Sequence, residues 1–269
     1  MTPPFANLAF ADPGLRKLVR APWSLCYGAD QEGMPGVIAP DAHVEFVFQT
    51  GEPCNMLAGS TAHATPRAMI FAQRHGTVSL APTGANGIIA FRALPAVASS
   101  ILGRSLVDCW DRPVPLSEMI GADADRLVGQ LARASVAGRA ALLEDWLTSR
   151  LSDWTAENVR NERLQRTLLW RTGGERLSVW TGALAMSERT LRRQFEKHAG
   201  LSPKQLAMSG RILRACAALS DRGEIPIAHI ALDVGFGDQA AFTNAFRRYV
   251  GTTPAALRAE PLVYCERGG

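Results

Sequence analysis

Residues 191–206 recur in type and spacing 51 residues farther along the chain, and this internal repeat limits the possible folds more than any other sequence feature. The first set is Leu191, Phe195, Gly200, Ser202, Pro203 and Leu206, and the second is Phe242, Phe246, Gly251, Thr253, Pro254 and Leu257. Several matches at one offset are hard to obtain by chance. A fixed period indicates a structural unit that is built more than once.

Each copy of the repeat predicts a capped amphipathic helix. Ser187 precedes the first helix and Asp238 the second, and short side chains with an oxygen atom cap the free N–H groups at a helix start. Gly200 and Gly251 favour the left-handed conformation in which many helices end. A Ser-Pro or Thr-Pro pair then predicts the start of the following helix, because proline suits the first helical position.

A shorter helix is predicted before each capped helix, over residues 176–182 in the first copy and 226–234 in the second. In the second copy, Ala231 and Gly235 stand just before Phe236. A small residue lets two helices cross closely, and glycine permits a sharp turn between them. Each copy is therefore predicted to be a helix-turn-helix, whose second helix can enter a DNA major groove.

These residues resemble the double helix-turn-helix DNA-binding domain of AraC/XylS-type transcriptional regulators, over residues 161–258. The structural positions that match are Ser187, Leu191, Phe195, Ala231, Gly235, Phe236, Phe242, Phe246, Gly251 and Pro254. Two positions depart from the family pattern: Thr181 stands where the family favours alanine, and Ala185 where it favours the turn glycine. Left-handed geometry costs a residue other than glycine on the order of 1 kcal/mol, so we expect a looser or differently built first turn.

The first recognition helix is rich in arginine, which can donate two parallel hydrogen bonds to guanine. The resemblance implies base contacts from Arg189, Arg192 and Arg193, with phosphate an equal alternative for Arg193. The alternative role for these side chains is an ion pair on the helix surface, with Glu188 or Glu196.

The second recognition helix exposes a neutral polar set, predicted to be Gln239, Ala240, Thr243 and Asn244. The two amides suit adenine, and the two smaller side chains suit the methyl group of thymine. Phosphate contacts, which set register but not sequence, are expected from Lys204, Arg247 and Arg248. Residues 203–220 are predicted to form one connecting helix. Recognition helices held about 34 Å apart can enter successive major grooves, and a dimer would read two such sites.

The charge of the chain is unevenly distributed. Residues 160–258 hold 16 Lys and Arg against 8 Asp and Glu, whereas residues 1–159 hold 12 against 15. The formal net charge of +4 therefore conceals a basic C-terminal part, as expected where one domain binds a polyanion. The alternative is an arginine-rich helical surface that is merely solvated.

The N-terminal half is predicted to contain short strands at residues 43–49, 68–73, 77–81 and 87–92, where apolar and polar residues alternate. A helix is expected at residues 94–106, a turn at 111–115, and two helices between 123 and 154. The apolar stripe of those two helices either packs on its own domain or forms a dimer interface. The predicted class is α+β: a small β-sheet or barrel with helices, followed by an all-α domain. The resemblance implies that the barrel is cupin-like.

Two domains are predicted, a sensor or dimerisation domain at residues 1–157 and a DNA-binding domain at 158–260; we call these the N-terminal half and the C-terminal half. The resemblance implies a sequence-specific transcriptional regulator that binds promoter double-stranded DNA as a homodimer. It further implies control by an unknown small-molecule effector and, in an activator, contact with RNA polymerase. With no long apolar run and no secretory signal, a cytoplasmic protein without a membrane span is expected.

No enzymatic motif, metal site or cofactor is predicted. His43 and Glu45 form only part of a cupin metal set. Two alternative functions remain open: a protein-binding adaptor, and a sensor in which a cysteine accepts an alkyl group or is oxidised. Cys26, Cys54 and Cys109 are the candidates for such a thiol, although the five cysteines are mainly expected to be reduced packing residues.

Overall fold

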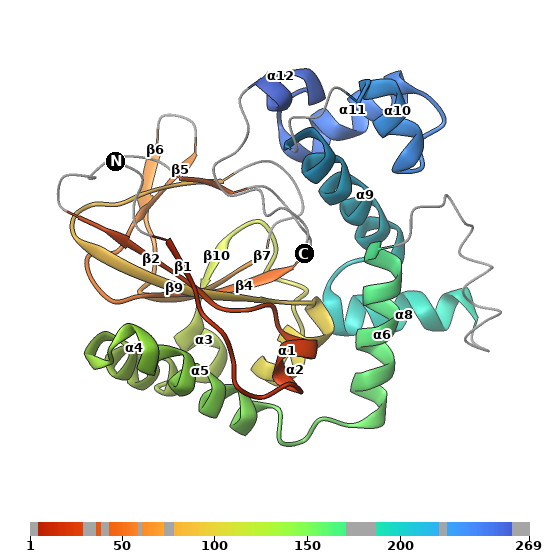
Figure 1. The fold of residues 1–269 in the computed structure, drawn as a ribbon. Helices are drawn as coiled ribbons and strands as arrows, with labels where there is room; N and C mark the ends of the chain where they lie inside the picture. Colours follow the sequence, from red (N-terminus) through yellow and green to blue (C-terminus); the bar gives the residue numbers. More distant parts are fainter. Residues whose placement is uncertain are drawn as a thin grey trace.

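The computed structural model describes residues 5–28, 36–38, 43–58, 61–72, 78–170, 187–220 and 225–259. Two antiparallel sheets and several helices form the N-terminal half, and helices alone form the described part of the C-terminal half (Figure 1). The predicted α+β class is therefore confirmed. The predicted helix at 176–182, with Thr181 and Ala185, lies outside the described residues.

Six strands form the larger sheet in the order β1 (Phe5–Asn7), β2 (Trp23–Tyr27), β9 (Asn86–Ala93), β4 (Val44–Gln49), β7 (Ala68–Ala72) and β10 (Pro113–Pro115). The smaller sheet has the order β3 (Gly36–Ile38), β8 (Val78–Ala81), β5 (Asn55–Ala58) and β6 (Thr61–Ala64). The four predicted strands correspond to β4, β7, β8 and β9. The strands β1, β2, β3, β5, β6 and β10 were not predicted.

Strand β4 has both of its faces covered. Val44, Phe46 and Phe48 face the helices, where the rings of Phe46 and Phe91 stack with centroids 4.6 Å apart. Val47 faces the smaller sheet, where a second cluster of apolar residues includes Leu25, Met69, Ile88 and Ala90. The predicted apolar face of β4 is confirmed, but the expected half-buried strand is not, because the smaller sheet covers the opposite face. The larger sheet therefore separates two apolar layers.

The helices of the N-terminal half are α1 (Leu15–Leu18), α2 (Pro95–Leu102), α3 (Leu116–Ile120), α4 (Asp123–Arg133) and α5 (Val136–Arg150). Helices α4 and α5 lie below the larger sheet (Figure 1) and bury their apolar stripe in the chain's own core. Two predictions need correction. Helix α2 ends before residue 106, since Gly103 adopts a left-handed φ of 66°. The predicted turn at 111–115 contains β10, because proline is accepted at a sheet edge.

The C-terminal half contains α6 (Ala156–Trp170), α8 (Glu188–Ala199), α9 (Pro203–Ser220), α10 (Ile227–Asp233), α11 (Gln239–Val250) and α12 (Pro254–Ala259). Gly200, Gly235 and Gly251 have φ values of 63°, 89° and 85°, as their positions in the repeat predict. The predicted boundary at 157/158 falls within the first turn of α6 and stays a prediction. No helix among the described residues is both long and apolar enough to cross a membrane.

The two repeated units belong to different hydrophobic clusters. Leu191, Phe195 and Leu206 of the first unit are part of one large cluster with Leu106 and Val44 of the N-terminal half. The second unit has a cluster of its own, formed by Ile212, Ala215, Cys216, Leu219, Ile230, Ala231, Val234, Phe242, Phe246, Val250 and Leu257. Helix α9 contributes to both clusters. The repeat did not predict this difference.

Candidate nucleic-acid interface

The first recognition helix, α8, is fixed at both ends by the predicted residues. The Ser187 hydroxyl accepts a hydrogen bond from the backbone N–H of Thr190 at 3.1 Å. Leu191 and Phe195 are buried, and Gly200 ends the helix in the left-handed conformation. The opposite face of the helix is therefore turned outward.

Arg189, Arg192 and Arg193 are all exposed on that outer face. Of the alternative surface ion pairs, Arg192 has one, at 4.0 Å from its Nη2 to Oε2 of Glu188, and both side chains are largely exposed. An exposed pair at this distance contributes little stability. The guanidinium groups can therefore be redirected to DNA at small cost.

The second recognition helix, α11, is built in the same way. The Asp238 carboxylate accepts the backbone N–H of Ala241 at 2.7 Å. Phe242 and Phe246 are fully buried, and the ring of Phe236 lies 5.3 Å from that of Phe242. The predicted base contacts Gln239, Ala240 and Asn244 are exposed, and Thr243 is half-buried. The structure thus gathers these four on the outer side of one helix.

The predicted phosphate contacts are exposed and lie at helix ends. Lys204 is in the first turn of α9, and Arg247 and Arg248 are in the last turn of α11. The start of α9 also has a feature that was not predicted. The Ser202 hydroxyl accepts the backbone N–H of Gln205 at 3.2 Å, while the side-chain Oε1 of Gln205 accepts the backbone N–H of Ser202 at 2.9 Å. This reciprocal cap was visible in the sequence as serine followed three residues later by glutamine.

Helix α9 connects the two units and spans about 27 Å, at about 1.5 Å for each of its 18 residues. It approaches α6 so closely that a Cβ atom at Gly210 would lie 1.9 Å from the carbonyl oxygen of Leu169. Arg214 donates to the same oxygen at 2.7 Å, and burial lowers the pKa of its guanidinium. At the second unit, Arg211 lies 5.7 Å from the ring centroid of Phe236. Helix α9 is therefore held by contacts at several points along its length.

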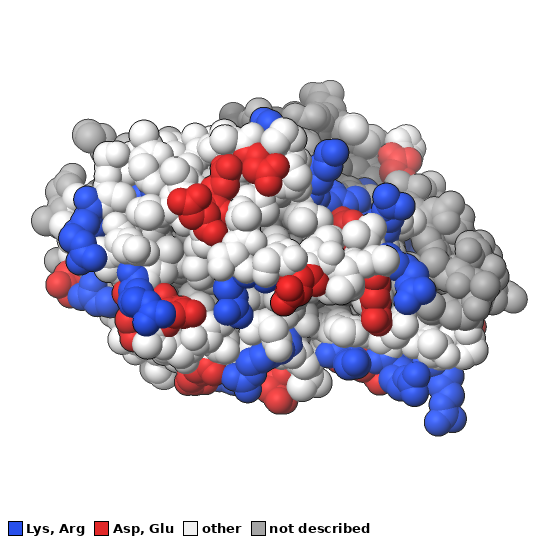
Figure 2. Space-filling model, turned by 90° about the horizontal axis from the view of Figure 1, so that it is seen from below, with Lys and Arg blue, Asp and Glu red and all other residues white. Residues whose placement is uncertain are grey.

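Basic side chains gather on one side of the molecule. Seen from below, Lys and Arg side chains are frequent in the right-hand part of the view, the side on which α6 and α8 lie (Figure 2). On α6, Arg160 and Arg163 are exposed in addition to the arginines of α8. Acidic and basic side chains alternate over the left and centre of that view. The charge asymmetry of the sequence is therefore visible on this face.

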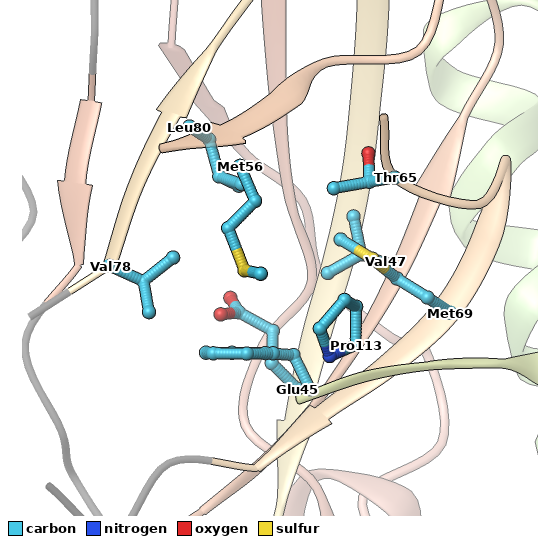
Figure 3. Close-up of a pocket in the computed structure, with 9 residues that line it drawn as sticks. Glu45, Val47, Met56, Thr65, Met69, Val78, Leu80 and Pro113 are labelled. Atoms are coloured by element: carbon cyan, nitrogen blue, oxygen red, sulfur yellow. The ribbon is translucent and has the colours of Figure 1, made fainter. Parts of the chain in front are cut away.

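A cavity lies between the two sheets of the N-terminal half (Figure 3). Met56 and Leu80 of the smaller sheet face Glu45, Val47 and Met69 of the larger sheet across it. Its volume is about 10 Å³, and a single water molecule needs about 10 to 15 Å³. The lining is mainly apolar, so the cavity suits an apolar group.

Glu45 provides the charged part of the cavity wall. Its Oε1 lies 3.3 Å from Nε of Arg92, its cross-strand partner, and both side chains are buried. The partial metal set of His43 and Glu45 therefore contains a carboxylate that is bound to arginine. Among the residues that the structure describes, no group of three His, Cys, Asp or Glu side chains is placed to hold a metal ion.

The four cysteines of the described ranges are reduced thiols that form no disulfide. Cys54, Cys109 and Cys216 are buried, and Cys26 is half-buried. Burial raises the pKa of the Cys54 and Cys109 thiols above the ordinary value. A reactive sensor needs a thiolate, which a lowered pKa provides. The environments of Cys54 and Cys109 therefore weigh against the cysteine-sensor alternative.

Comparison with known proteins identifies the same region. A family model described as a helix-turn-helix domain matches residues 180–260. The chain is 33% identical to the probable transcription factor PqrA of Proteus vulgaris over 105 residues. The aligned region makes up 38% of this chain and 85% of PqrA. It is 36% identical to the HTH-type transcriptional activator RhaS of Escherichia fergusonii over 74 residues. This aligned region makes up 28% of this chain and only 26% of RhaS.

Among solved structures, ToxT from Vibrio cholerae resembles the chain with a TM-score of 0.46 and 10% identity, over 90% of this chain and 97% of ToxT. The two capped recognition helices, the family match and the coverage of PqrA agree with one another. The chain therefore belongs to the AraC/XylS-type transcriptional regulators and is a DNA-binding regulator of that type.

Proposed function

We propose that α8 and α11 read base edges in successive major grooves of promoter double-stranded DNA, from a single chain. The observation that carries this proposal is the repeated arrangement itself: two capped helices with buried apolar faces and exposed polar faces, joined by α9. The proposed role is binding, without a catalysed reaction. The base contacts are those predicted from the sequence: Arg189, Arg192, Arg193, Gln239, Ala240, Thr243 and Asn244.

The two helices are proposed to contribute unequally. Helix α8 offers three arginines, each able to bind guanine bidentately for about 1 to 3 kcal/mol of discrimination. Helix α11 offers Gln239 and Asn244 for bases, with Arg247 and Arg248 in its last turn for phosphates. We therefore assign most of the sequence-dependent affinity to α8, and part of the register to the last turn of α11.

Selection of bound duplexes from a random pool, followed by titration of the selected duplex, tests this assignment. Arg189→Ala should relax base preference at one position of the selected sequence, whereas Arg248→Ala should weaken all sequences similarly. Loss of a phosphate contact should also reduce the dependence of affinity on salt concentration. The assignment is wrong if both variants select the same sequences with the same affinity as the wild type.

We further propose that the cavity between the sheets is the effector site. Its apolar lining and the buried carboxylate of Glu45 suit a small, mainly apolar molecule with one hydrogen-bond donor. Because the cavity has room for about one water molecule, the effector must separate the sheets as it binds. A true effector should raise the Tm of the wild type and have a smaller effect on Val47→Ile, which adds one methyl group to the cavity wall. Equal shifts in both proteins would place the effector elsewhere.

We also propose that the protein acts as a homodimer that reads two such sites and, if it is an activator, contacts RNA polymerase. An isologous dimer binds a palindromic arrangement of half-sites. Sedimentation of the protein on duplexes with one and two selected sites tests the dimer. Two protomers bound independently, with no dependence on half-site spacing, would contradict it.

A further inference from the structure

The C-terminal end of the first recognition helix lies against the N-terminal half. The indole Nε1–H of Trp110 donates a hydrogen bond to the carbonyl oxygen of Ala199, the last residue of α8, at 2.9 Å. Both residues are buried. The last four carbonyl groups of an α-helix lack a donor within the helix. A side chain 89 residues away in sequence therefore caps α8.

Gly200 makes a second contact at the same place. A Cβ atom there would lie 2.7 Å from Cα of Val107 and 2.8 Å from the carbonyl oxygen of Leu106. Any side chain at position 200 would push α8 away from this segment. At Gly251, the equivalent position of the second unit, a Cβ atom would meet nothing within 4 Å among the described residues. The close contact thus belongs to the first unit.

Trp110 itself is held by the larger sheet. It forms an isolated β-bridge with Ala72, and the N–H of Asp111 donates to the carbonyl oxygen of Ala72 at 2.7 Å. Asp111 has a φ of 61°, a left-handed conformation that is uncommon for residues other than glycine and is maintained by its surroundings. The backbone that presents the indole to α8 is therefore fixed to β7.

Helix α6 provides a second connection between the halves. The side-chain oxygen of Gln165 accepts the N–H of Ala96, at the start of α2, at 2.8 Å. Asn158 donates to the Ser100 hydroxyl of the same helix, also at 2.8 Å. Because α6 in turn contacts α9 near Gly210, the first unit is held on two sides.

From these contacts we propose that residues 106–111, the docking segment, position the first recognition helix on DNA, with Trp110 as the main positioning residue. The second recognition helix makes its contacts independently of this segment. The proposal rests on the base-reading role assigned above to Arg189. The proposal also links the role of Arg189 to the proposed effector site. Phe71 and Pro113 pair with each other in the sheet and line the cavity. They lie next to Ala72 and the docking segment, so a change at the cavity can reach Trp110.

A double-mutant cycle on the full chain tests the proposal. Arg189→Ala should lower affinity for the selected duplex by about 5- to 150-fold, the equivalent of one bidentate base contact. In the background of Trp110→Phe, which removes the N–H donor but keeps an aromatic ring, the same substitution should cost less than about 3-fold. Gln239→Ala should cost the same factor in both backgrounds. The proposal is overturned if Arg189→Ala weakens binding in the wild type and weakens it by the same factor in the Trp110→Phe background.

Footprinting of the two major grooves separates this inference from the base-contact assignment. Trp110→Phe should lose protection of the groove bound by α8 and retain protection of the groove bound by α11. If Arg189→Ala leaves affinity unchanged while Trp110→Phe loses the α8 footprint, Arg189 makes no base contact, and the proposal that Trp110 positions α8 is still supported. Higher affinity of Trp110→Phe for DNA would also overturn the proposal, because the hydrogen bond from Trp110 to Ala199 would then inhibit DNA binding by α8.

Two controls address folding. Trp146→Phe removes another indole of the N-terminal half, whose N–H has no hydrogen-bond partner among the described residues, and should leave both footprints unchanged. Gly200→Ala is a second variant of the contact, and it should reproduce the loss of the α8 footprint. Gly103→Ala is its matched control, because Gly103 also ends a helix with a positive φ. Among the described residues, the atom nearest to a Cβ at Gly103 would be Nη2 of Arg150, 4.0 Å away.

Discussion

Helices α8 and α11 each contain 12 residues, begin at a side-chain cap and end at a left-handed glycine, yet their surroundings differ. The buried face of α8 packs into the large cluster of the N-terminal half, and its end accepts a hydrogen bond from Trp110. Among the residues that the structure describes, the buried face of α11 packs within the cluster of the second unit. The same local motif is thus part of a larger body in one copy and a small separate body in the other.

The outer faces of the two helices differ in charge. Helix α8, which is fixed to the N-terminal half, exposes three arginines, whereas α11 exposes Gln239, Ala240 and Asn244. The strongest base contacts are therefore proposed on the unit whose position depends on the N-terminal half. A change in the N-terminal half would then alter binding strength mainly through α8.

The largest expected difference concerns the two clusters. Phe195→Ala and Phe246→Ala each remove a buried ring, at a cost of about 3 to 5 kcal/mol. Trp110 belongs to the large cluster and Trp146 and Trp154 pack against it, whereas the sequence of the second unit contains no tryptophan, so the change of tryptophan fluorescence on unfolding includes the large cluster. Denaturant unfolding followed by fluorescence should shift strongly in Phe195→Ala and little in Phe246→Ala. Equal shifts would mean that the two units unfold as one body.

A smaller difference is expected at the two terminal glycines. Alanine at a positive φ costs on the order of 1 kcal/mol, and this applies to Gly200 and Gly251 alike. At Gly200 the added methyl group also meets the backbone of residues 106–107, and overpacking typically adds about 1 to 3 kcal/mol. Hydrogen exchange of each unit measures both losses. If Gly251→Ala proved as costly as Gly200→Ala, the docking contact would contribute no strain.

The two helices should also differ in how much binding free energy is lost when one base contact is removed, by an amount similar to or smaller than that expected at the two glycines. Arg189→Ala removes up to about 3 kcal/mol of discrimination if the contact is bidentate. Gln239→Ala removes a neutral contact and should leave the dependence of affinity on salt concentration unchanged, because no charge is lost. Titrations of the selected duplex at several salt concentrations compare the two. A larger loss in Gln239→Ala would reverse the proposed ranking of the helices.

The features that the sequence predicted are local ones. The caps at Ser187 and Asp238 join groups three residues apart, and the glycine turns depend on one residue each. The alternation in β4 and β9 marks the face that packs on the helices, and it also is read within a few residues, whereas burial of the opposite face was not predicted. Such features follow from backbone chemistry and short periodicity, so the two recognition helices and the main strands could be predicted.

The contacts that join the halves could not be predicted in this way. Trp110 and Ala199 are 89 residues apart, and no periodicity relates an indole in a loop to the end of a helix. The pairing of Glu45 with Arg92 depends on the register of β4 with β9. Gly210 did leave a signal, because glycine in a helix interior is unfavourable and often marks close packing. Its partner Leu169 nevertheless depends on the tertiary arrangement.

The smallest expected difference between the two units concerns how the stability of each depends on pH. His198 of α8 and Tyr249 of α11 occupy equivalent positions of the 51-residue repeat, and each is half-buried. Burial lowers the pKa of His198 below its ordinary value of 6.5 and raises the pKa of Tyr249 above its ordinary value of 10.0. In both cases the folded protein favours the neutral side chain, since desolvation penalises the charged form.

The sign of the pH dependence therefore differs between the units. The unfolded chain binds a proton at His198 near pH 6.5 while the folded chain does not, so stability of the first unit should fall as the pH drops below about 6.5. The unfolded chain loses the Tyr249 proton near pH 10 while the folded chain keeps it, so stability of the second unit should fall above about pH 10. His198→Gln should remove only the acid effect on the fluorescence transition, and Tyr249→Phe only the alkaline effect on hydrogen exchange in the second unit. If either substitution removed both effects, the two units would share one titration and the contrast between them would be lost.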